Sequence, residues 1–113
     1  MTIKQGYLVM FDVLDALFEE QKEDASIGLR ELLSELSLDT FSDGQPADPA
    51  VWADWQMCVK KVCASENNIR PEELKPLMFT FLHYYMSEFG FELGDVIAAL
   101  QNDPGLDLKL NAN

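Results

Sequence analysis

The most apolar helical pattern in the chain covers residues 71–89, which read PEELKPLMFTFLHYYMSEF. Apolar side chains recur in it at steps of three and four residues, which places them on one face of an α-helix: Leu74, Leu77, Met78, Phe81, Leu82, Tyr85 and Phe89. Pro71 and the acids after it are typical of a first helical turn, and Gly90 is typical of a helix end. The stretch therefore predicts a helix at the centre of the hydrophobic core.

Two more helices are predicted before this one, at residues 3–22 and 26–36. The first has apolar residues at helical spacing along one face, among them Tyr7 and Leu14. In the second, Ser26 is positioned to cap the helix N-terminus. Its apolar side is expected to consist of Ile27, Leu29, Leu32, Leu33 and Leu36.

The remaining segments complete a helical pattern. Residues 39–48 are rich in turn formers and predict a loop. Asp48-Pro49 is a strong start for a helix over residues 49–65, and residues 92–101 predict another helix. Residues 106–113 are expected to form an extended or frayed tail. The sequence thus predicts an all-α fold, in which residues 1–113 form a single compact domain of about five helices packed as antiparallel helical hairpins.

The charge of the chain is strongly negative and unevenly distributed. Twenty acids oppose eight bases, which gives a net charge of -12. Residues 1–55 hold twelve of the acids and three of the bases, a net of -9. Such a field repels nucleic acid and anionic lipid and attracts basic surfaces, so neither nucleic acid nor a membrane is an expected partner. The simpler alternative is that the acids only keep the protein in solution.

Neither a leader nor a disulfide is predicted. The apolar stretch near the N-terminus is interrupted by Asp12 and Asp15, unlike a signal peptide, and no run reaches the roughly 20 apolar residues of a membrane span. Cys58 and Cys63 are five residues apart on one predicted helix, so they lie on different faces and are too distant to be bridged. Two reduced thiols favour the cytoplasm as the compartment.

The residues that could support catalysis form no recognisable set. His83 is the only histidine, and no neighbour in the sequence is placed to orient it as a base for Cys58 or Cys63. These three side chains are also fewer than the four ligands of a structural zinc site. We therefore expect no catalytic residues, no metal and no cofactor. A small enzyme that uses these side chains remains the less favoured alternative.

Two aromatic residues and an acidic stripe are candidates for partner contact. Trp52 and Trp55 share one side of their helix, where they either enter the core or anchor an interface. Carboxylates repeat along the outer face of the first helix, which is either a solvated face or a docking face: Asp12, Asp15, Glu19 and Glu23.

Two blocks carry a family resemblance: SIGLRELLSELSL at residues 26–38 and DGQPADPAVWADW at residues 43–55. Together they resemble the small immunity proteins of bacterial contact-dependent growth inhibition and related polymorphic toxin systems. Over residues 7–55 the chain follows the family pattern, with three residues between Gly28 and Leu32 that look like an insertion. The motif positions, which are equally expected to determine the fold, are Ile27, Gly28, Leu32, Leu33, Gly44, Pro49, Trp52 and Trp55.

The resemblance implies a cytoplasmic antidote that binds and neutralises the toxic C-terminal domain of a cognate contact-dependent inhibition effector. Such toxins are often nucleases with basic grooves, which an acidic helical face would cover. The expected contact residues are the acids of the first helix and of residues 39–54: Asp12, Asp15, Glu19, Glu23, Asp39, Asp43, Asp48 and Asp54. The alternative is an acidic adaptor or nucleic-acid mimic that binds a basic regulatory protein.

Overall fold

Residues 1–37 and 48–111 are described by a computed structural model of the chain. This part of the chain contains six α-helices and no strand, which confirms the predicted all-α fold. The elements are α1 (Ile3–Gln21), the 3-10 turn η1 (Lys22–Asp24), α2 (Ile27–Leu36), α3 (Pro49–Val62), α4 (Pro71–Phe89), α5 (Gly94–Gln101) and α6 (Leu106–Leu110). The loop predicted at residues 39–48 lies almost wholly outside the described residues.

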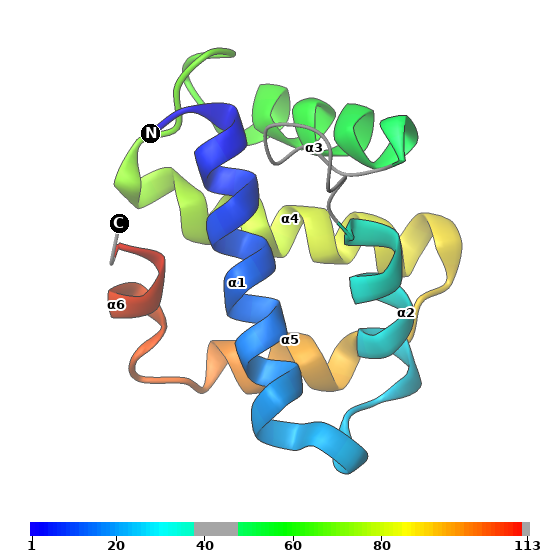
Figure 1. Ribbon diagram of the computed structural model, residues 1–113. Coiled ribbons are helices and arrows are strands. Elements are labelled where there is room, and N and C mark those ends of the chain that lie inside the picture. Colours follow the sequence, from blue (N-terminus) through cyan, green and yellow to red (C-terminus); the bar gives the residue numbers. More distant parts are fainter. Residues whose placement is uncertain (38–47, 112–113) are drawn as a thin grey trace.

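The helices pack as two antiparallel hairpins and a C-terminal cover (Figure 1). Helix α2 runs back alongside α1, and α4 runs back alongside α3, as the sequence predicts. Helix α1 crosses in front of α4, while α5 and α6 close the remaining side of the molecule. The Cα radius of gyration is 13.2 Å, close to the roughly 13 Å expected for a compact domain of this length.

Helix α4 lies at the centre of the core, as its sequence predicts. Its buried residues are Leu74, Leu77, Met78, Phe81, Leu82 and Tyr85. Gly90 ends the helix in the left-handed conformation with φ 71°, which glycine adopts without strain. The exception is Phe89, which we predicted to be on the buried face but which is 53% exposed on the last turn of α4. Its ring packs instead against the buried Tyr85 and the half-buried Tyr84 and Phe91.

Helix α2 confirms the predicted N-cap and corrects one predicted core residue. The Leu29 amide donates to the Ser26 hydroxyl oxygen over 3.1 Å. Ile27, expected on the apolar side, is 68% exposed. The helix turns by about 100° per residue, so Ile27 lies opposite the side on which Leu32 and Leu36 are buried.

The predicted tail is wrong for residues 106–110, which form α6. Leu106 and Leu110 are one helical turn apart and both are buried, whereas Leu108 between them is 78% exposed. The sequence of residues 106–110 alternates apolar and polar residues, a pattern typical of a strand. The segment nevertheless forms a single turn of helix. Lys109 holds this turn through an ion pair of 2.7 Å with Asp103. The other boundaries shift slightly, because α3 ends at Val62 and α5 begins at Gly94.

Most of the described motif residues serve the fold. Gly28 touches the backbone at Glu92 so closely that a Cβ would overlap the Glu92 carbonyl oxygen and lie 2.6 Å from its carbon. Leu32 is buried, Leu33 is partly buried, and Pro49 is the first residue of α3. Trp55 is fully buried and its indole donates to the Ile3 carbonyl over 3.0 Å. Gly44 lies outside the described residues, and Ile27 is exposed, like Pro49, but has no capping role.

The buried Tyr7 links α1 to both α2 and α3. The Tyr7 hydroxyl donates to the Leu36 carbonyl over 2.7 Å and so joins α1 to the end of α2. Burial raises the pKa of Tyr7, which keeps this hydroxyl protonated as a donor. The Tyr7 ring also meets Trp52 and Trp55 edge to face, at centroid distances of 5.9 and 5.8 Å. Trp52 is partly buried beside these rings.

Glu73 joins the end of α3 to the start of α4, and we expect it to make stability depend on pH. Its two carboxylate oxygens accept from the Arg70 and Ala64 amides, each over 2.8 Å. These bonds, the one from Arg70 first, lower the pKa of Glu73. The stability that the ionised Glu73 adds to the fold is present above the ordinary pKa of the carboxyl group. It is lost as pH falls through the lower pKa of the folded state.

Glu73→Gln should therefore lower the urea midpoint at pH 7 and flatten its fall between about pH 5 and pH 3. Glu72→Gln is the matched control, since Glu72 is exposed on the same first turn. Urea titrations at pH 7 and at several values between about pH 5 and pH 3 measure the effect. Parallel pH profiles for the wild type and Glu73→Gln would show that this carboxylate plays no such role.

Candidate functional site

The first candidate surface is the α1 acidic face, which consists of Asp12, Asp15 and Glu19 on α1 and Glu23 on η1. All four side chains are exposed. Among the described residues, the two side-chain ion pairs are Lys75–Asp107 and Lys109–Asp103, and neither includes a carboxylate of this face. The face therefore directs unneutralised negative charge into solvent.

Arg30 lies close to this face but forms no ion pair with any of its carboxylates. Its guanidinium donates to the carbonyl oxygens of Lys22 and Glu23 over 3.0 and 3.4 Å, and it lies 5.5 Å from the centre of the Phe18 ring. These contacts hold the cation against the C-terminal end of α1, where the helix dipole favours a positive charge. Arg30 is thus a structural residue at the edge of the acidic face.

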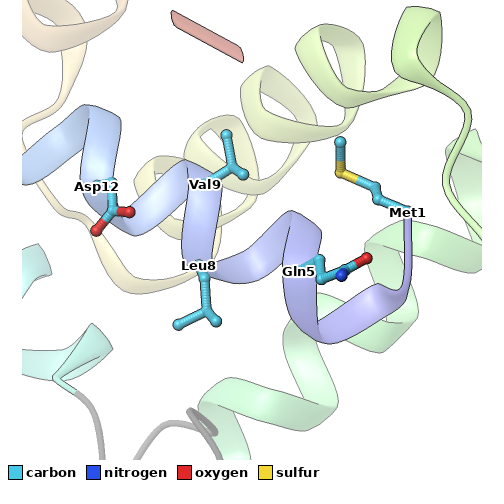
Figure 2. Close-up of a pocket in the computed structure, with 5 residues that line it drawn as sticks. All are labelled: Met1, Gln5, Leu8, Val9 and Asp12. Atoms are coloured by element: carbon cyan, nitrogen blue, oxygen red, sulfur yellow. The ribbon is translucent and has the colours of Figure 1, made fainter. Parts of the chain in front are cut away.

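A shallow groove continues the α1 surface toward the N-terminus. It encloses about 360 Å³ and is lined by Met1, Gln5, Leu8, Val9 and Asp12. Figure 2 shows Leu8 and Val9 pointing away from each other on different sides of the helix, with Asp12 one turn further along. Apolar side chains thus supply most of the groove lining, and the α1 acidic face begins at Asp12, at the end of the groove.

The second candidate surface is a smaller groove between the end of α2, the start of α3 and the end of α4, here called the acidic aromatic groove. It encloses about 220 Å³, and its lining residues are Glu35, Asp48, Ala50, Val51, Asp54, Tyr85, Phe89 and Phe91. It thus combines three carboxylates with three aromatic rings, and its described lining contains no basic residue. No described residue lines both this groove and the one along α1.

Two of the groove carboxylates are held in place by hydrogen bonds. The Tyr85 hydroxyl donates to Asp54 Oδ2 over 2.9 Å. Asp48 caps α3 by accepting the Ala50 amide on Oδ1 over 2.9 Å. Burial, and then the Asp54 carboxylate, raise the pKa of Tyr85, so the phenol remains a proton donor at neutral pH. Tyr84 also hydrogen-bonds to Asp54, and each carboxylate retains lone pairs for a further donor.

The structure divides the predicted contact residues between two places. Asp12, Asp15, Glu19 and Glu23 share the α1 acidic face, while Asp48 and Asp54 line the acidic aromatic groove. Asp39 and Asp43 lie outside the described residues. Four lining residues were not predicted as contact residues, because only tertiary packing brings them together: Glu35, Tyr85, Phe89 and Phe91. The one local signal was the pair of phenylalanines on either side of Gly90.

The thiols and the histidine are not arranged as an activated nucleophile. Cys58 is fully buried, and this burial raises the pKa of its thiol to about 11. Burial and the nearby Glu73 also raise the pKa of Cys63. Both shifts oppose the lowered pKa that makes a cysteine reactive. His83 is exposed on α4, and within residues 1–37 and 48–111 no three metal-binding side chains gather.

In the described part of the chain, no helix is both long and apolar enough to cross a bilayer. Comparisons of the chain with models of known protein families, with curated proteins and with solved structures find no match.

Proposed function

We propose that this chain is an immunity protein, which acts in the cytoplasm by binding the toxic C-terminal domain of a cognate contact-dependent inhibition effector. The observation that carries the proposal is the α1 acidic face, whose four exposed carboxylates form no ion pair with another described residue. The family resemblance of residues 26–55 supports the same function. It supplies the class of partner, which charge alone does not.

The acidic face would act through charge complementarity. A nuclease toxin carries a basic groove for its nucleic-acid substrate. An acidic surface of complementary shape accelerates association with such a groove. Once bound, the same carboxylates occupy the region that the phosphates would enter. The toxin would thus be blocked without any chemical step, and the antidote needs neither metal nor cofactor.

The proposal is tested by growth rescue. The gene of this chain should lie directly downstream of a gene for a large secreted effector. Cells that express the C-terminal domain of that effector should stop growing, and co-expression of this chain should restore growth. An adaptor would instead copurify with an endogenous basic protein and would leave the arrest in place.

We expect reversal of the α1 acidic face to weaken toxin binding. The triple variant Asp15→Lys, Glu19→Lys, Glu23→Lys should bind the toxin domain about 100-fold less tightly, because like charges that face each other cost several kcal/mol. Helical circular dichroism should persist, since all three side chains are exposed. Titration calorimetry at two salt concentrations measures both the affinity and its salt dependence.

A control with the same change in charge tests whether position matters. The exposed acids Glu66, Glu72 and Asp95 lie outside both candidate surfaces, so their replacement by lysine should have a much smaller effect on affinity. Equal losses in the two triple variants would mean that only the net charge attracts the toxin. Unchanged affinity in the first variant would remove the α1 acidic face from the interface.

A further inference from the structure

We infer that the acidic aromatic groove is a socket for one arginine side chain of a partner protein. This deepens the proposed function and rests on it, since the arginine would belong to the basic surface of the toxin. The groove encloses about 220 Å³, below the roughly 300–1,000 Å³ of pockets that take whole small molecules. Its size suits a single inserted side chain.

The charge of the groove selects a cation. Glu35, Asp48 and Asp54 line it from two helix ends, and no described base lines it. Asp48 uses one oxygen to cap α3 and keeps the other for a partner. Asp54 accepts from Tyr85 and also interacts with Tyr84, but a carboxylate has about four lone-pair sites and so retains acceptor capacity. Because α3 and Tyr85 already fix these two carboxylates, an incoming cation would find its acceptors prearranged.

The aromatic residues select a planar cation over a point charge. Phe89 is 53% exposed, and its ring meets Tyr85 and Phe91 at centroid distances of 5.0 and 6.5 Å. A large exposed phenylalanine beside carboxylates offers a surface on which a guanidinium can stack while it donates to the acids. Arginine combines stacking with a planar set of donors, whereas lysine offers only a compact ammonium.

The charge of the groove can be removed without removing its hydrogen bonds. In the groove variant, Glu35→Gln, Asp48→Asn and Asp54→Asn, asparagine at position 48 still caps α3 and asparagine at position 54 still accepts from Tyr85. The matched α1 variant, Asp12→Asn, Asp15→Asn and Glu19→Gln, makes the same change in charge on exposed residues elsewhere.

The test uses the full chain and a tri-arginine amide peptide, with a tri-lysine amide peptide as the comparison. Backbone amide spectra should show peptide-dependent shifts at Val51, Asp54 and Phe91. Tri-arginine should bind several-fold more tightly than tri-lysine. Its affinity should fall about tenfold in the groove variant and much less in the α1 variant. Phe89→Ala should reduce it about threefold.

Several results would overturn the socket. Equal losses in the two charge variants, or equal affinity for the two peptides, would show attraction by net charge alone. Shifts confined to α1 would show that the peptide binds the α1 acidic face instead of the groove. Dimerisation of the wild type that Phe89→Ala abolishes would mean that a second copy of this chain occupies the groove. Because the peptides replace the toxin, failure here leaves growth rescue intact, and failure of growth rescue leaves the peptide result intact.

Discussion

Replacement of Gly28 by alanine should lower the free energy of unfolding by about 3 kcal/mol, the upper part of the range for an overpacked core site. The new Cβ would overlap the Glu92 carbonyl oxygen and lie 2.6 Å from its carbon. Both atoms belong to the backbone, so the contact cannot be relieved by a side-chain rotation. The start of α2 must therefore move away from the segment between α4 and α5.

Gly94→Ala provides the matched control for this prediction. It adds the same methyl group to the first residue of α5, where the Cβ has no neighbour within 4 Å. Alanine is favoured over glycine in helices, so this variant should be as stable as the wild type or up to about 1 kcal/mol more stable. Urea titrations of both variants measure the difference. Equal stability of Gly28→Ala and Gly94→Ala would contradict the close packing at Gly28.

Trp55→Ala should have a comparable or larger effect, about 3–5 kcal/mol, the range for large aromatic residues removed from a core. Trp55 is fully buried, and its ring meets Tyr7 and Phe81 edge to face at 5.8 and 5.5 Å. The substitution also leaves the Ile3 carbonyl without its indole donor. Since domains of this size are stable by only about 5–15 kcal/mol, a large fraction of that margin would be lost.

The neighbouring Trp52 tests the distinction between the core and its edge. Trp52 is partly buried and meets Tyr7 at 5.9 Å, so Trp52→Ala should destabilise the fold less than Trp55→Ala. Thermal unfolding followed by circular dichroism gives the ranking. If Trp52→Ala proved the more damaging variant, the assignment of Trp55 to the core and Trp52 to its edge would be wrong.

Local sequence signals were sufficient for most of the fold. The caps at Ser26 and Asp48, the proline at position 71 and Gly90 each act through neighbouring backbone groups, so the helix ends they mark could be located closely. The centre of the core was also predictable, because the apolar face of α4 is long and regular. These features require no knowledge of what lies across the molecule.

The errors have tertiary causes. Helix α6 consists of one short turn, and such a turn depends on packing, here the burial of Leu106 and Leu110. Ile27 was assigned to the core from its apolar character, although the close contact at Gly28 turns it toward solvent. The acidic aromatic groove brings the end of α4 against the end of α2 and the start of α3, so no local pattern could have revealed its full lining.

The most direct test of the account is calorimetric titration of the purified toxin domain, encoded beside this chain, with the full chain. We predict a one-to-one complex with nanomolar or tighter affinity that weakens as salt rises from about 50 to 200 mM, because the contact carboxylates are exposed. An absence of binding at micromolar concentrations, with both proteins folded, would contradict the proposed function.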